Sequence, residues 1–96
     1  MKPAPPLPGD LILLARLVSA SPRHHMRRTA RRILDETLAA HLHRIATGQA
    51  HPRLGDGSLA GRIMCEDLPP LALADHRDFL TALRIVAEEI LKHTAR

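Results

Sequence analysis

The chain has 96 residues, of which 45% are hydrophobic, and carries a formal net charge of +4 at pH 7. This length allows one domain with one core, because single domains of about 100 residues are typical. The chain contains no tryptophan, no tyrosine and a single phenylalanine, which argues against recognition of single-stranded nucleic acid by base stacking. Its basic balance instead favours a polyanionic partner, nucleic acid more than membrane. The alternative explanation is a GC-rich genome, which raises arginine use everywhere.

The number of cysteines and the length of the apolar runs indicate in which cellular compartment the protein resides. A single cysteine, Cys65, excludes an internal disulfide and is compatible with a reducing cytoplasm. Residues 11–20 resemble the apolar region of a signal peptide, but the upstream prolines, Asp10 and Arg16 argue against export. No apolar run reaches the roughly 20 residues that a membrane span needs. We therefore expect a soluble cytoplasmic protein that requires no membrane and no cofactor.

The N-terminal part predicts a tail followed by a short helix. Residues 1–9 contain four prolines and should form a mobile, extended Pro-rich tail before a single helical domain over residues 10–96. Asp10 is expected to cap a helix that starts at Leu11. This helix is apolar on nearly every side, so it is either sandwiched in the core or shared with another subunit of a homo-oligomer. The residues expected in the oligomer interface are Leu11, Leu13, Leu14, Leu17 and Val18.

The longest predicted helix runs from Ser21-Pro22 to the residue before Gly48. Ser21 is expected to cap it, with Pro22 at the first helical position, where a missing N–H costs nothing. Apolar residues recur at spacings of three and four, which is one face of an α-helix. The members of this stripe are Met26, Ala30, Ile33, Leu34, Leu38, Leu42 and Ile45. We expect the whole stripe to be buried.

The second half of the chain predicts a structured loop and two further helices. Two glycines bracket Asp56 in the loop, and Asp56 and Ser58 are expected to satisfy the turn and cap a short helix over residues 59–66. Asp75 is expected to cap a final amphipathic helix. No strand alternation is visible, so the fold class is all-α: a small bundle of three to four helices with one long central helix.

A block of arginines at the start of the long helix is the strongest functional lead. Its members are Arg23, Arg27, Arg28, Arg31 and Arg32. Only Asp35 and Glu36 follow nearby in the sequence, and like charges four residues apart repel on a helix. The block is therefore expected to bind phosphates, with non-specific contact to double-stranded DNA as the hypothesis and a merely solvated face as the alternative. A helix-turn-helix is disfavoured because the turn has no glycine and the second helix is too long.

Metal binding and catalysis find little support in the sequence. The chain has seven histidines, but His24 and His25 are adjacent, and His41 and His43 point about 200° apart on a helix. The residue types of a hydrolytic triad occur at His51, Asp56 and Ser58, yet they lie within one glycine-bearing turn, where capping is the favoured role. We therefore expect no metal site and no enzymatic activity.

One stretch of the chain resembles a known family. The run from Ala46 to Leu59, followed by a Pro-rich link and an Asp-started final helix, is similar to a family of short alphaproteobacterial proteins. These proteins are associated with gene-transfer-agent or prophage-like clusters, beside the large packaging ATPase and in the position of a small terminase subunit. The resemblance implies a DNA-packaging accessory that oligomerises and recruits a packaging motor, and it implies no functional residues. A helical adaptor or regulator that binds only protein is the alternative.

Overall fold

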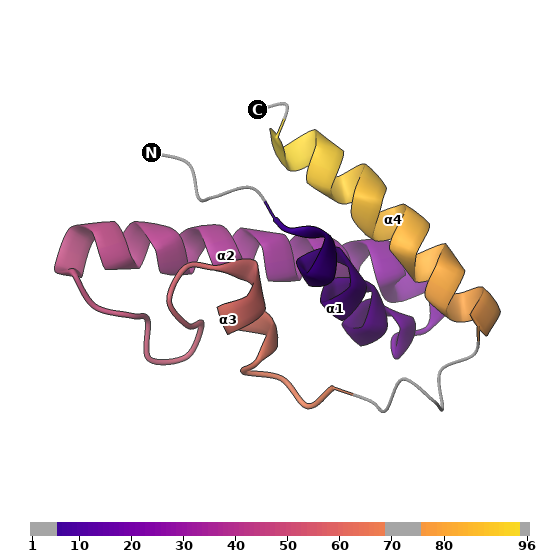
Figure 1. Cartoon of the computed structure of the whole chain (residues 1–96), viewed down its shortest axis with the longest axis horizontal. Coiled ribbons are helices and arrows are strands. Elements are labelled where there is room, and N and C mark those ends of the chain that lie inside the picture. The colour runs from indigo at the N-terminus through magenta and orange to yellow at the C-terminus, as the bar shows by residue number, and fades with distance from the viewer. Residues whose placement is uncertain (1–5, 69–75, 95–96) are drawn as a thin grey trace.

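The computed structural model describes residues 6–68 and 76–94. Its elements are α1 (Pro8–Ser19), the 3₁₀ turn η1 (Arg23–His25), α2 (Met26–Thr47), α3 (Leu59–Ile63) and α4 (His76–Thr94). Figure 1 shows α2 lying along the length of the molecule, with the other helices gathered against it. In the described ranges the only β-type pairing is an isolated bridge between His51 and Gly55. The prediction of an all-α bundle with one long helix is confirmed.

Helix α1 begins earlier than the sequence pattern indicated. Pro8 is its first residue, where proline is well tolerated because the first N–H of a helix lacks an intrahelical acceptor anyway. Pro8 and Gly9 are therefore helical, and the predicted boundary of the tail after residue 9 is wrong. Asp10 lies in the first turn and is not the N-cap; its carboxylate accepts a hydrogen bond from the Leu7 amide at 2.9 Å. Residues 1–5 of the expected tail and the expected cap Asp75 lie outside the described ranges.

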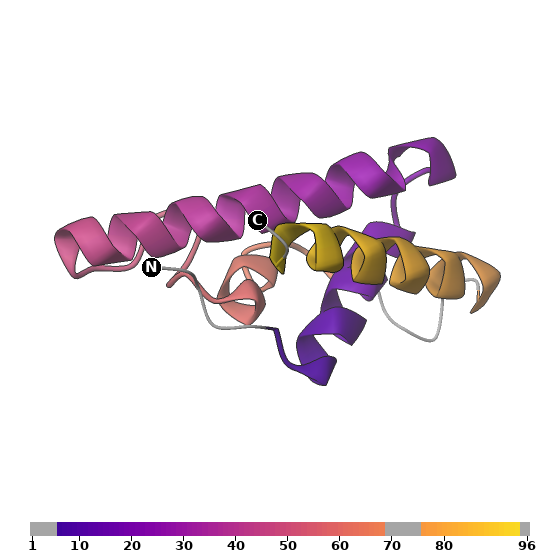
Figure 2. The ribbon, with the colours of Figure 1, turned by 90° about the horizontal axis from the view of Figure 1, so that it is seen from above.

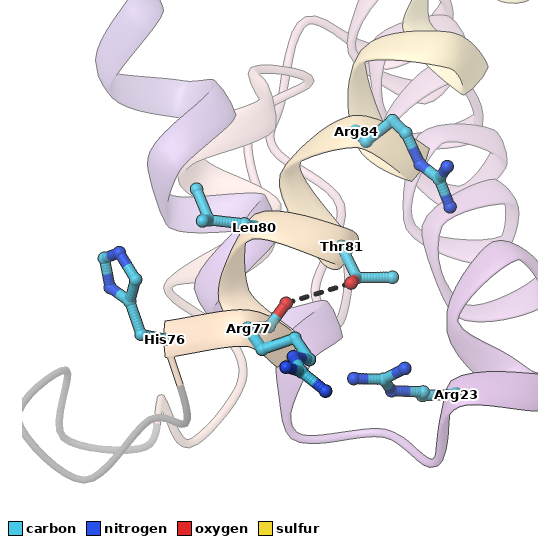
Figure 3. A pocket seen from close by; sticks show the side chains of 6 residues that line it. All are labelled: Arg23, His76, Arg77, Leu80, Thr81 and Arg84. Atoms are coloured by element: carbon cyan, nitrogen blue, oxygen red, sulfur yellow. Dashed lines mark hydrogen bonds between the residues drawn. The ribbon is translucent and has the colours of Figure 1, made fainter.

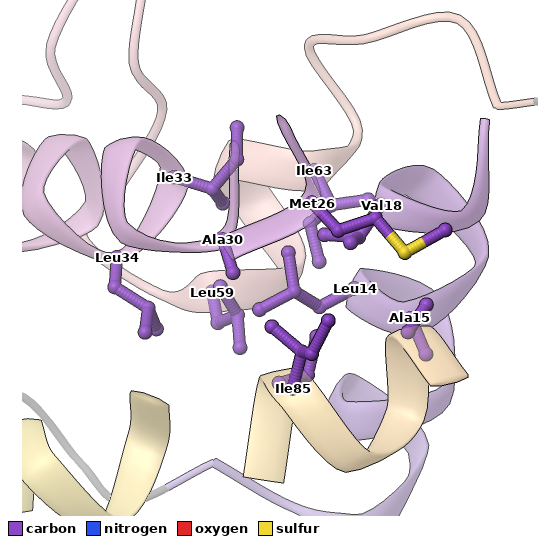
Figure 4. Packing of buried hydrophobic residues seen from close by; sticks show 12 residues of the cluster. Leu14, Ala15, Val18, Met26, Ala30, Ile33, Leu34, Leu59, Ile63 and Ile85 are labelled. Atoms are coloured by element: carbon purple, nitrogen blue, oxygen red, sulfur yellow. The ribbon is translucent and has the colours of Figure 1, made fainter. Parts of the chain in front are cut away.

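Most apolar side chains of α1 are covered within one chain, although Ile12 is 48% exposed. Leu14 and Val18 are completely buried, and Leu11, Leu13 and Leu17 pack against the same core. Figure 4 shows Leu14 meeting residues of α2, α3 and α4, such as Ala30, Leu59 and Ile85. A second subunit is therefore not needed to bury this helix. Leu14 and Val18, which were expected in an oligomer interface, are core residues, so that part of the expectation is wrong.

The beginning of α2 also differs from the prediction, whereas its end does not. Pro22 has an extended ψ of 146°, and the His25 amide donates to the Pro22 carbonyl, so η1 precedes the α-helix. The N-cap of α2 is consequently His25 and not Ser21, whose hydroxyl lies 3.1 Å from that of Thr29; the expected cap at Ser21 is wrong. Gly48 ends α2 in the left-handed conformation, with φ of 74°, as glycine at this position commonly does.

The long apolar stripe of α2 is buried over only part of its length. Its first four members belong to the core, but Leu38, Leu42 and Ile45 are 38%, 51% and 51% exposed. Figures 1 and 2 agree that α4 lies over the half of α2 nearer η1. In the last turn of α4, the Nε2 atom of His93 lies 3.1 Å from Oδ1 of Asp35. Helix α4 therefore ends before it reaches Leu38. The expectation that the whole stripe is buried is wrong, because no described helix extends over its second part.

The loop after α2 packs back on α2 and starts α3. Gly57 has φ of 97°, and a Cβ atom at this position would lie 2.8 Å from the Cα atom of His41, so only glycine fits. Ser58 is the N-cap of α3, accepting a hydrogen bond from the Gly61 amide at 3.0 Å. Asp56 accepts from the hydroxyl and the amide of Ser58, at 2.6 and 3.0 Å, and these bonds lower the pKa of Asp56. Helix α3 ends at Ile63, three residues earlier than expected.

Candidate nucleic-acid interface

The five arginines singled out from the sequence diverge in space. Arg23 belongs to η1, and the other four occupy the first two turns of α2. Adjacent residues on a helix point about 100° apart, so Arg27 and Arg31 point in a different direction from Arg28 and Arg32. The contacts described below divide it into three sets, directed toward α4, toward α3 and toward solvent.

The first set is tied to α4 by a buried carboxylate. Glu89 is 1% exposed and accepts hydrogen bonds from Arg27 and Arg31, each at 2.6 Å, and from Lys92 at 3.0 Å. Burial raises the pKa of Glu89, but the hydrogen bonds from Arg31, Lys92 and Arg27 outweigh it and lower the pKa to about 2. Arg27 also reaches Glu88 at 3.3 Å. Glu89 is thus ionised at neutral pH and holds α4 to α2.

The second set is tied to α3 by a buried arginine. Arg62 is 4% exposed and donates to Glu66 at 2.7 Å and to Glu36 at 3.2 and 3.3 Å. Burial would lower the pKa of Arg62, but the hydrogen bonds to Glu66 and Glu36 raise it above its usual value. Arg32 donates to the same Glu36 carboxylate at 3.0 Å. Glu36 of α2 therefore joins the two helices through Arg62 of α3, and it also pairs with Arg32 on its own helix.

These networks correct one step of the sequence argument. The block was expected to lack nearby acids, yet Arg27 and Arg31 meet a carboxylate that lies 62 and 58 positions later. One signal in the sequence could have found this partner. Glu89 follows Ala82 by seven residues and Val86 by three, so it falls on the apolar face of α4, where an unpaired carboxylate is disfavoured. The uneven distribution of charge is a second signal. The first half of the chain has an excess of basic residues and the acidic residues follow in the second half, which predicts ion pairs between the two halves.

The third set points toward solvent at the start of α2. We define the basic corner as Arg23, His24, His25 and Arg28. The side chain of Arg23 is 57% exposed and pairs with Asp78 of α4 at 2.8 Å. Arg28 is exposed and donates to the His25 ring, whose pKa is lowered by desolvation and by the charges of Arg28 and His24. Protonation of His25 is thus disfavoured, and Arg23 and Arg28 are the fixed positive charges of the corner.

The residues considered for catalysis form turn contacts. Nδ1 of His51 accepts from the amides of Arg53 and Leu54, at 3.0 and 3.1 Å, and the His51 ring stacks edge-on against His43. The Ser58 hydroxyl donates to Asp56, so it does not donate to a histidine. Among the described residues, no group of three or more metal-ligating side chains is close enough to hold an ion. In the same part of the chain, no helix has the length and apolarity needed to cross a membrane.

The described features define a class: a basic all-helical domain whose long helix is tied to its neighbours by two ion networks. The chain belongs to the family described as "Domain of unknown function (DUF7742)", whose model matches residues 4–90. No curated protein and no solved structure matches the chain. The matched range contains the basic corner, Glu89 and Arg62. Both ion networks therefore lie within the matched range, except for Lys92.

Proposed function

We propose that the protein is a non-enzymatic DNA-contacting protein that binds the phosphate backbone of double-stranded DNA without reading its sequence. The observation that carries this proposal is the basic corner, where Arg23 and Arg28 are exposed at the start of α2. Guanidinium groups match the geometry of phosphate oxygens, and phosphate contacts alone carry no sequence information. Arg27, Arg31 and Arg32 remain partly exposed and add to the positive potential, although their acidic partners offset much of it.

The biological role that we propose is DNA packaging in the cytoplasm, with the protein acting as an accessory that resembles a small terminase subunit. This role is supported by the resemblance of residues 46–59 and by the basic corner. Oligomerisation and recruitment of a packaging motor belong to the same proposal. Leu14 and Val18 of α1 are buried within the chain, so such a contact would use exposed apolar residues, of which Leu38, Leu42 and Ile45 form one group on α2.

The test is retention of duplex DNA as a function of salt, comparing two matched variants. Arg23→Gln/Arg28→Gln removes two charges from the basic corner, whereas Arg44→Gln/Arg53→Gln removes two exposed charges near the opposite end of α2. Wild type should lose affinity steeply between about 50 and 200 mM salt, by counterion release. The corner variant should reduce the slope of log affinity against log salt by about two, and the control variant should leave it near the wild-type value.

Replacement of the whole arginine block is a poorer experiment. Arg27 and Arg31 are the partners of the buried Glu89, so their loss would destabilise the fold as well as remove charge. Unrelated duplexes should bind alike to wild type. Absence of DNA retention at low salt, or full retention by the corner variant, would contradict the proposal.

A second candidate is a helical adaptor that binds only protein. It is favoured by the three exposed apolar residues on the second half of α2, which are spaced at four and three positions along one face. Light scattering at two protein concentrations, together with the salt titration, separates the candidates. A mass above the 10.6 kDa of one chain without DNA retention would favour the adaptor.

A further inference from the structure

The loop between α2 and α3 contains a turn that is closed by the ring of a histidine. Nδ1 of His51 accepts hydrogen bonds from the amides of Arg53 and Leu54, at 3.0 and 3.1 Å. The backbone of His51 also exchanges two hydrogen bonds with Gly55, at 2.8 and 3.2 Å. Both side-chain bonds need a lone pair on Nδ1, so the ring must be neutral, with its proton on Nε2. The closed turn therefore selects one protonation state of His51.

Protonation of His51 is incompatible with these two bonds. An imidazolium carries a proton on each ring nitrogen and has no lone pair left to accept from an amide. The amides of Arg53 and Leu54 would then face an N–H group instead of an acceptor. Histidine is the side chain that ordinarily changes charge between about pH 5 and 8. The turn should consequently be closed at neutral pH and open as the pH falls through this range.

The contact between His51 and α2 acts in the same direction. The ring of His43 lies edge-on to that of His51, with 4.9 Å between the ring centroids. Two protonated rings this close would repel one another. In the described part of the chain, the side-chain contacts of His51 are to two amides and a ring, and none is to a carboxylate. The fold thus offers the imidazolium no counter-charge in place of the lost bonds.

The charged groups of the neighbouring elements are engaged elsewhere. The acid of the loop, Asp56, accepts from Ser58, and the positive charge of Arg44 on α2 also stabilises its ionised form. On the side of α3, the acids Glu36 and Glu66 are bound by Arg62. Arg53, the other charged residue of the loop, has the same sign as an imidazolium.

The first half of α2 does not depend on this turn. It is tied to α4 through Glu89, whose pKa of about 2 keeps it ionised over the whole range in which histidines titrate. The turn lies instead beside the second half of α2, where Gly57 packs against His41. Loss of the His51 bonds should therefore be a local opening and not a global unfolding.

We propose that His51 is a pH-sensitive switch for the loop over residues 49–57. The neutral ring closes the loop against the second half of α2, and the protonated ring releases it. The basic corner lies at the other end of α2, so the switch stands independently of the proposed contact with DNA.

The experiment follows the full-length protein by NMR from about pH 7.5 to about pH 5 and compares wild type with His51→Asn and His76→Asn. The Asn side chain has an amide oxygen that can accept from the two amides, and it does not titrate. His76 is an exposed histidine at the start of α4, and Figure 3 shows its ring directed away from Arg23 and Arg77. His76→Asn is therefore a control that removes a titrating ring without touching the loop.

In wild type, protonation of the His51 ring should coincide with displacement of the amide resonances of Arg53 and Leu54. Protection of these amides from hydrogen exchange, corrected for the intrinsic rate, should fall by about tenfold. The control should behave like wild type, whereas His51→Asn should keep both amides unchanged across the range. The amide of Glu89 reports on the rest of the fold and should not respond in any of the three proteins.

Three outcomes would overturn the switch. The first is retention of both amide bonds after the His51 ring is protonated, and the second is a ring that stays neutral over the whole range. The third is a wild-type response in His51→Asn, which would assign the opening to another group, such as His43. The ring nitrogen resonances of wild type report protonation directly, so the first two outcomes are decisive even if His51→Asn folds poorly.

Discussion

The two halves of α2, residues 26–37 and 38–47, carry the same apolar period but have different surroundings. The first half contributes Ile33 and Leu34 to the core and is tied to α3 and α4 by ion pairs. The second half exposes Leu42 and Ile45 and is supported by the loop that packs on His41. The periodicity of a helix thus identifies the face that can be buried. How much of that face is buried depends on where the neighbouring helices end.

The largest expected effect compares the same substitution in the two halves. Ile33→Ala removes a completely buried side chain and should lower the free energy of unfolding by about 2–5 kcal/mol. Ile45→Ala removes a side chain that is 51% exposed, so the loss should stay below about 1 kcal/mol. Urea unfolding of both variants measures the difference. Equal losses would show that the second half is covered in solution, as an oligomer would require.

The next effect concerns the carboxylate that ties the first half of α2 to α4. Glu89→Gln removes the charge that accepts from Arg27, Arg31 and Lys92, and it should cost about 1.5–3 kcal/mol of stability. Glu88→Gln is the control, since Glu88 is exposed and its pairs are longer; its cost should be about 0–1 kcal/mol. Similar costs for the two variants would contradict a special role for the buried carboxylate.

The same carboxylate predicts a dependence on pH. Folding lowers the pKa of Glu89 to about 2, from about 4.3 in an unfolded chain, so the folded state favours its ionised form. Its contribution is therefore fully present above about pH 4.3 and is lost as the pH falls through about 2. Wild type should lose stability over this window more steeply than Glu89→Gln does. Parallel acid-unfolding curves would contradict the assignment.

The smallest effect concerns the loop that supports the second half of α2. Ser58→Ala removes the acceptor of the Gly61 amide and should cost about 0.5–2 kcal/mol, as the loss of a helix cap does. Ser19→Ala is the control, because the Ser19 hydroxyl only donates back to a carbonyl of its own helix; its effect should stay within about 0.5 kcal/mol. Unchanged melting of Ser58→Ala with loss of biological activity would indicate that Ser58 has a functional role instead.

Local signals predicted most of the helices but misplaced the starts of α1 and α2. Gly48 ends α2 and Ser58 starts α3 because cap geometry depends on a few neighbouring residues. The start of α1 was misplaced because Asp10 was expected to precede the helix as its N-cap. Asp10 instead lies within the first turn, which begins at Pro8, and its carboxylate accepts from the Leu7 amide. The start of α2 was misplaced because the turn after Pro22 is a 3₁₀ turn. A 3₁₀ turn and an α-helix can begin with the same kind of residue, so the sequence does not separate them.

Tertiary contacts set the limit on predicting the site. The arginine block was visible in the sequence, but Glu89, the partner of Arg27 and Arg31, comes from a helix that only the fold brings near. The burial of α1 was left open between core and interface, and the packing of α4 decides it. Arg23 pairs with Asp78, 55 residues later, and no periodicity reports such a contact.

The long separation between the arginines and Glu89 has a consequence for the order of folding. A chain synthesised from its N-terminus completes α2 long before Glu89 is made, because Arg27 and Arg31 precede it by 62 and 58 positions. During that interval the arginines repel one another and lack their buried counter-charge. Docking of α4 closes a long loop, which makes it a late and entropically costly step. The nascent protein is therefore more basic on this face than the finished one, and the final helix neutralises it.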